Sequence, residues 1–231
     1  MNSNQKDLRR GIFYWKDGKQ YLSVTEILKI IDKPALRYWF GQEVYYAMVK
    51  DPTLNEAAAL SAPYQTSESA KNRGTTVHSI VEAYKASGKR LEGIPEEFQG
   101  FATAFYKFMD EVKPEIVEQE KTVFDEEHKI GGTLDMYCKI GNSMYVLDIK
   151  TGKDIYSEVD LQLSAYAHML RLTGTKVDNI GVVLLEIGDN KRPTGNYKFA
   201  QRTERHDIFL HVKALYEWQN REKLIKLGYA K

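Results

Sequence analysis

The chain has 231 residues, a length that suits one domain, since single hydrophobic cores rarely grow beyond about 250–300 residues. Hydrophobic residues make up 42% of it and charged residues 28%, as in an ordinary folded globular protein. The net charge is only +1, so any polyanion would have to bind through local basic patches. The single cysteine, Cys138, excludes an internal disulfide and a four-cysteine zinc or iron–sulfur site within the chain.

The sequence also bears on location. No apolar run approaches the roughly 18 residues that suggest a membrane span, and the first ten residues lack the apolar stretch of a signal peptide. Together with the lone cysteine, these features favour a reducing, cytoplasmic compartment and no association with membranes.

The N-terminal part, residues 1–115, is predicted to be mainly helical. Ser23, followed three residues later by Glu26, predicts a capped helix start, and Pro34 predicts a second helix that runs to Met48. High polarity at 51–70 predicts a mobile loop or a loosely held helix. Apolar residues return at helical spacing in two further segments, 74–86 and 96–112, and the aromatic stripe of the second is expected to be core.

The periodicity then changes to that of strands. Three strands in succession, at 116–124, 131–138 and 144–149, predict an antiparallel meander. A helix at 158–172, stopped by Gly174, precedes a strand at 180–187 with a partner at 197–201. A long helix at 204–227 is expected to close the chain. The order of helix, three strands, helix and strand predicts an α/β fold.

A carboxylate and an ammonium lie close together on the most apolar strand. Asp148 and Lys150 share one face because side chains alternate along a strand, and a hairpin could set Asp135 opposite Asp148. Charges in such a strand are costly unless they are paired, metal-bound or functional. Two carboxylates, with the backbone carbonyl of Ile149, suit a hard cation such as Mg²⁺ or Mn²⁺, and Lys150 could activate water or stabilise phosphate charge. The alternative is a structural Asp–Lys ion pair, with Asp135 merely ending a turn.

Three motifs carry a resemblance to a known family. They are Gly132-Thr133-Leu134-Asp135, Asp148-Ile149-Lys150-Thr151-Gly152, and Gln162 with Tyr166 four residues later. They are similar to the motifs of the PD-(D/E)XK nuclease superfamily, in its RecB-like branch. A weaker likeness at residues 21–39 resembles phage exonucleases and the mitochondrial genome-maintenance exonuclease, so the resemblance extends from Tyr21 to Tyr166.

The resemblance implies a fold and a metal site. The fold is a restriction-endonuclease-like core in one nuclease domain over 1–231, with a catalytic α/β part at 116–231 and a mainly helical part at 1–115. Asp135, Asp148 and Lys150 are expected to be catalytic, and one or two Mg²⁺ or Mn²⁺ ions are expected at Asp135, Asp148 and Ile149. His78, in the element that starts at Arg73, is implied as a further ligand. Glu120 is implied as a fourth catalytic residue, in competition with Glu118.

Substrate contacts are expected on one helical face and beside the motifs. These residues are Gln162, Tyr166, Arg73, Thr151 and Lys153. The segment around Tyr64 is a candidate cover for single-stranded DNA. The other histidines, His128, His168, His206 and His211, have no partner in the sequence pattern and are assigned to surface or packing.

The function implied is a metal-dependent DNA exonuclease in recombination, repair or replication, in a bacterial or phage-infected cytoplasm. The expected partner is DNA that is single-stranded or has free ends, and a recombination or replication protein is a further candidate partner. The iron–sulfur subgroup is excluded by the cysteine count. A structure-specific endonuclease on the same core, a catalytically silent nucleic-acid-binding module, and a structural protein with buried charges stay open as alternatives.

Overall fold

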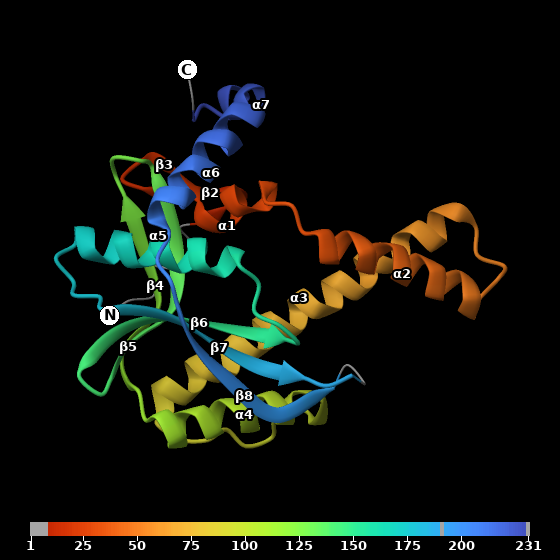
Figure 1. Cartoon of the computed structure of the whole chain (residues 1–231), viewed down its shortest axis with the longest axis horizontal. Coiled ribbons are helices and arrows are strands. Elements are labelled where there is room, and N and C mark those ends of the chain that lie inside the picture. The colour runs from red at the N-terminus through yellow and green to blue at the C-terminus, as the bar shows by residue number, and fades with distance from the viewer. Residues whose placement is uncertain (1–8, 190–191, 230–231) are drawn as a thin grey trace. The chain divides into compact units, whose positions relative to one another are not determined.

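The structure is a computed structural model that describes residues 9–189 and 192–229. Its contacts divide the chain into two compact units (Figure 1). The first comprises the chain up to Ile31 and from Ile80 onward, and the second is Asp32–Ser79. The expectation of one nuclease domain over 1–231 stays a prediction.

The first unit is built on a mixed sheet. In chain order its described strands are β1 (Arg9–Arg10), β2 (Phe13–Lys16), β3 (Lys19–Ser23), β4 (Glu115–Asp125), β5 (Ile130–Ile140), β6 (Ser143–Gly152), β7 (Asn179–Ile187) and β8 (Pro193–Arg202). Along the sheet the order is β1-β2-β3-β5-β6-β7-β8, with β4 also paired to β5. The predicted antiparallel meander is confirmed as β4, β5 and β6, and β7 then joins β6 in parallel. The predicted α/β fold class is confirmed.

The N-terminal segment corrects part of the sequence prediction: residues 9–23 form three short strands joined by turns, whereas 24–112 is mainly helical, as predicted. Phe13–Lys16 and Lys19–Ser23 pair as an antiparallel hairpin around Asp17-Gly18, and both turn residues have positive φ, 49° and 73°. An Asp-Gly pair is a strong two-residue hairpin signal, because both positions of such a turn need positive φ.

A short helix follows this hairpin. Helix α1 (Val24–Ile27) begins where predicted but gives way at once to the 3-10 turn η2 (Leu28–Ile30). The predicted capping pair is wrong, since the Ser23 side chain makes no cap hydrogen bond. The Glu26 carboxylate instead accepts a hydrogen bond from the Tyr216 hydroxyl, at 3.2 Å. A tertiary partner has replaced the local one.

The second unit is helical. Helix α2 (Pro34–Lys50) starts at the predicted proline and has no buried residue. Helix α3 (Glu56–Ser87) begins in this unit and runs on past Ser79, and it contains the predicted helix at 74–86. Of the two alternatives for 51–70, the helix is correct from Glu56 onward.

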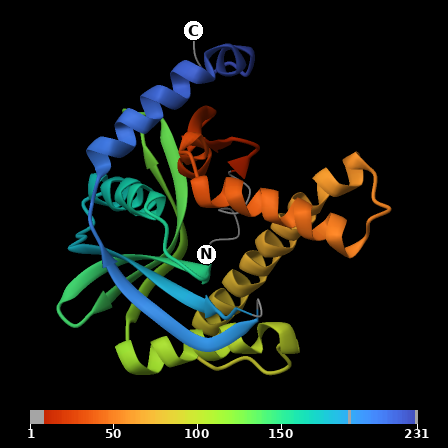
Figure 2. The ribbon, with the colours of Figure 1, turned by 45° about the vertical axis from the view of Figure 1, so that its right-hand side comes forward.

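Helices cover both faces of the sheet (Figure 2). Helix α4 (Glu96–Val112) packs against β7 and β8 and buries Phe101, Phe105 and Phe108 completely, which confirms the aromatic stripe as core. Helix α5 (Glu158–Leu172) has the predicted bounds and packs against β4 to β7 on the opposite face.

The C-terminal helix is not continuous, which corrects the prediction for 204–227. It is divided into α6 (His206–Gln219) and α7 (Arg221–Lys226). The break falls at Asn220, whose side-chain amide donates to the Tyr216 carbonyl at 2.9 Å. Asparagine offers the backbone such an alternative to helical bonding, which explains the break.

Among the described residues, no helix combines the length and the apolar character that a membrane span requires.

Candidate active site

The candidate site lies where strands β5 and β6 part. Their ladder runs from Ile140–Ser143 to Met136–Leu147 and stops there, one pair before Asp135 would face Asp148. The backbone N–H of Ile149 donates instead to Oδ2 of Asp135, at 2.7 Å. A side-chain carboxylate therefore takes over the bond that a strand partner would make, and this holds Asp135 at the fork.

Asp148 and Lys150 form the centre of the site on β6. The Asp148 carboxylate is buried, 1% exposed, while the Lys150 side chain is 44% exposed. Oδ1 of Asp148 accepts hydrogen bonds from Lys150 Nζ and from Gln162 Nε2, both at 3.0 Å. Burial by itself lowers the pKa of Lys150, but the charges of Asp148 and Asp135 outweigh it and raise the pKa above its usual value. Lys150 is therefore an ammonium at neutral pH, and the charges of both carboxylates stabilise this protonated form.

Helix α5 supplies the second layer of the site. Gln162 and Tyr166 lie one turn apart, as predicted, with Gln162 Nε2 3.4 Å from the Tyr166 hydroxyl. The Tyr166 ring is buried, which raises the pKa of its hydroxyl well above the usual value. It lies directly on Gly132, where a Cβ would come within 2.4 Å of ring atom Cε1. The glycine of the first motif is needed for this close approach.

Strand β4 places the two competing glutamates in different surroundings. Glu120 has a positive φ of 47°, so the regular alternation of side chains is broken at this residue. The break lets Glu118 form an ion pair with Lys121, three residues on, although a regular strand would direct them to opposite faces. A carboxylate oxygen of Glu120 lies within 4.8 Å of one of Asp135. The structure thus brings Glu120 to the fork.

One acidic residue near the site was not anticipated from the sequence. Glu158, in the first turn of α5, raises the pKa of Lys150 by its charge, so it lies close to the ammonium. It precedes Gln162 by four residues, as Gln162 precedes Tyr166, and all three share one helical face. That spacing was the signal that could have identified it.

The remaining predicted residues are less closely tied to this centre. Arg73 and His78 belong to the second unit, on α3, and their roles stay predictions. Alternation along β6 turns Thr151 to the face opposite Lys150. Lys153 follows the end of β6, where its exposed ammonium pairs with Asp189 at 2.8 Å. Metal contact by the Ile149 carbonyl stays a prediction as well.

The donor set of the fork fits a divalent cation. Oδ2 of Asp148 is buried and lies 2.9 Å from Lys150 Nζ, but outside hydrogen-bonding geometry, so it accepts no hydrogen bond within the described residues. The carboxylates of Glu120 and Asp135 are close together, an arrangement that a cation or a proton stabilises. Oxygen donors of this kind are those that Mg²⁺ and Mn²⁺ prefer.

The chain was compared with known proteins. No family model matches it, and neither does any curated protein. Among solved structures, SSO0001 aligns with a TM-score of 0.41 and 11% identity over 89% of this chain and 78% of its own. A putative exonuclease from Eubacterium rectale aligns with a TM-score of 0.37 and 13% identity, over 91% of this chain and 83% of its own. An alkaline exonuclease from Laribacter hongkongensis aligns with a TM-score of 0.33 and 11% identity, over 90% of this chain and 94% of its own.

Exonucleases are among these structural neighbours, as the resemblance predicted. The chemistry proposed for this chain rests on its own side chains.

Proposed function

We propose that the protein is a metal-dependent deoxyribonuclease that degrades DNA from its ends. The observation that carries the proposal is the fork of β5 and β6. There the Asp135 carboxylate accepts the Ile149 N–H at 2.7 Å, and Asp148 faces the Lys150 ammonium. Two fixed carboxylates and one fixed cation on one side of a sheet edge form a centre suited to phosphodiester hydrolysis.

The metal would be held by Asp135, Asp148 and Glu120, with the Ile149 carbonyl as a further oxygen and His78 as the ligand that the motif resemblance implies. When bound, Mg²⁺ or Mn²⁺ supplies positive charge against the phosphate and a more acidic water. Support for this assignment comes from the buried Oδ2 of Asp148, which accepts no hydrogen bond within the described residues, and from the proximity of Glu120 to Asp135.

Lys150 contributes charge rather than basicity. Its raised pKa keeps the proton on Nζ, so it can neutralise an oxygen of the scissile phosphate and stabilise the charge that grows there. Gln162 holds Asp148 through Oδ1, and Tyr166 packs behind Gln162. These two residues orient the carboxylate, and contact with the phosphate backbone is a further role that we propose for them.

A preference for single-stranded DNA is supported by the second unit. Its helices expose four tyrosine rings, those of Tyr38, Tyr45, Tyr46 and Tyr64. Exposed aromatic rings stack on unpaired bases, at about 1–3 kcal/mol per base, and do so regardless of sequence.

The test of the nuclease is a time course on end-labelled linear DNA, single- and double-stranded, with Mg²⁺, Mn²⁺ or EDTA. Lys150→Ala is expected to lower turnover by about 10²–10³-fold, the usual effect of losing a fixed charge that stabilises the transition state. Lys139→Ala is the matched control, because Lys139 is also a half-exposed lysine with a carboxylate neighbour, on β5. Turnover of Lys150→Ala within twofold of the wild type would remove Lys150 from the mechanism.

The mode of attack needs a second substrate. An exonuclease leaves circular single-stranded DNA intact and degrades it once it is linearised, whereas an endonuclease cuts both. Tyr45→Ala and Tyr46→Ala are expected to slow degradation of single strands at least fivefold and to spare duplex ends, with Trp218→Ala of the first unit as control. DNA binding without degradation under any metal would support the silent binding module instead.

A further inference from the structure

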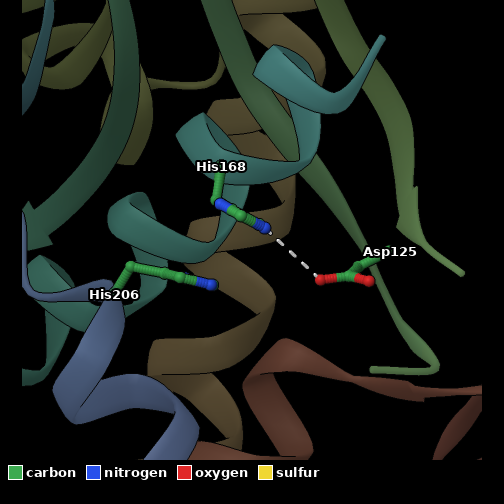
Figure 3. A group of neighbouring side chains, drawn as sticks. All are labelled: Asp125, His168 and His206. Atoms are coloured by element: carbon green, nitrogen blue, oxygen red, sulfur yellow. Dashed lines mark ion pairs between the residues drawn. The ribbon is translucent and has the colours of Figure 1, made fainter. Parts of the chain in front are cut away.

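A second group of metal-ligating side chains lies in the first unit, away from the motifs. Figure 3 shows Asp125, His168 and His206 directed toward one another. Asp125 ends β4, His168 is on α5, and His206 begins α6. One ligand atom from each lies within 4.8 Å of those of the other two. Three elements far apart in the sequence thus meet at one point.

The two histidine rings form one side of this cluster. They stack with centroids 3.8 Å apart and planes 14° apart, and in Figure 3 both reach toward the Asp125 carboxylate. Both ring nitrogens of His206 are buried and have no hydrogen-bond partner within the described residues. An imidazole nitrogen that accepts no hydrogen bond can offer its lone pair to a cation.

The carboxylate forms the other side. Asp125 is fully buried and is held by His128, whose backbone N–H bonds Oδ1 at 2.9 Å and whose Nδ1 lies 2.8 Å from Oδ2. His168 Nε2 lies 3.6 Å from the same Oδ2. His128 therefore fixes the carboxylate in the way that a hydrogen-bonded neighbour commonly orients a metal ligand.

We propose that Asp125, His168 and His206 bind a transition-metal ion, Zn²⁺ above all, at a site distinct from the fork of β5 and β6. Two imidazole nitrogens and one carboxylate oxygen, with a fourth position left for water, match the ligand preference of zinc, whereas Mg²⁺ and Ca²⁺ favour oxygen alone. Zinc ligands lie about 2.0–2.2 Å from the ion, so the three ligand atoms, now within 4.8 Å of one another, would draw together around it.

The site would stabilise the first unit. It joins the start of α6 to the middle of α5 and to the end of β4, and α6 packs mainly on α5. An ion that binds the folded chain and not the unfolded one raises the melting temperature in proportion to the logarithm of its concentration. The proposal does not depend on the nuclease, since it shares no residue with the fork.

The test is Zn²⁺ titration of metal-free protein by calorimetry, with millimolar Mg²⁺ present throughout to compete at the fork. Co²⁺ serves as a spectroscopic probe, because its visible absorption reports nitrogen and oxygen ligands in a tetrahedral site. One equivalent of Zn²⁺ is expected for the wild type and equally for Asp148→Asn, which disables the fork. Retained binding in Asp148→Asn separates this site from the proposed active site.

Variants decide which residues bind. His206→Ala and His168→Ala are expected to abolish the Co²⁺ absorption and the rise in melting temperature with Zn²⁺, and His128→Ala to weaken binding by about 10–100-fold. His211→Ala is the control, since His211 also lies on α6 but bonds the Asp207 carbonyl. If His206→Ala does not fold, His206→Asn replaces it. Unchanged Zn²⁺ binding in His206→Ala and His168→Ala, or no Zn²⁺ binding in the wild type, would overturn the proposal.

Discussion

The close contact between Gly132 and Tyr166 makes a sharp test of the site, through Gly132→Ala. The added Cβ would lie 2.4 Å from Cε1, 3.2 Å from Cδ1 and 3.3 Å from Cζ of the Tyr166 ring. A flexible side chain could turn away from such a contact. The Tyr166 ring is buried on all sides and cannot turn away without displacing its neighbours.

Overpacking of this kind costs about 1–3 kcal/mol. For a chain of this length, 1 kcal/mol lowers the melting temperature by about 2–4 °C, so we expect a fall of roughly 2–12 °C. Turnover should fall as well, because the displaced ring supports Gln162, which holds Asp148. Circular dichroism melting and the end-labelled DNA assay measure the two effects.

Two further variants isolate the cause. Gly152→Ala places its Cβ no closer than 3.7 Å to Leu184, and we expect its melting temperature to stay within a degree or two of the wild type or rise. Tyr166→Leu removes the ring atoms that the new methyl group would meet, so Gly132→Ala should lower the melting temperature much less in that background. An equal fall in melting temperature in both backgrounds, or no fall in the wild-type background, would refute the steric argument.

Three other predictions each follow from the surroundings of one residue. Burial raises the pKa of Cys138 to about 12, so the native protein should not react with a thiol reagent at pH 8 and should react stoichiometrically in denaturant. Burial alone would raise the pKa of Glu26, but Lys29 holds it below its usual 4.5. The stability that this ionised carboxylate contributes is present above pH 4.5 and is lost as pH falls through the lower folded pKa. Glu26→Gln should therefore flatten the acid limb of a profile of melting temperature against pH. Gly74→Ala, with open space around its Cβ inside α3, should stabilise the helix by about 1 kcal/mol in urea denaturation.

Local patterns were sufficient for much of the catalytic part. Strand alternation placed Asp148 and Lys150 on one face, and helical periodicity with the stop at Gly174 gave the bounds of α5. Both depend only on neighbours in sequence, because the period of a strand or a helix is a property of the backbone itself. The hairpin at Asp17-Gly18 was equally local and could have been recognised.

Other features depend on contacts between distant residues. Glu120 and Glu118 are equivalent by alternation, and a positive φ within β4 separates them. The carboxylate of Asp135 accepts the Ile149 N–H only because β5 and β6 part at that point. His168 and His206, assigned to surface or packing from the sequence, meet Asp125 because α5, α6 and β4 converge. No short-range pattern encodes such meetings, since they arise only when packing brings separate elements together.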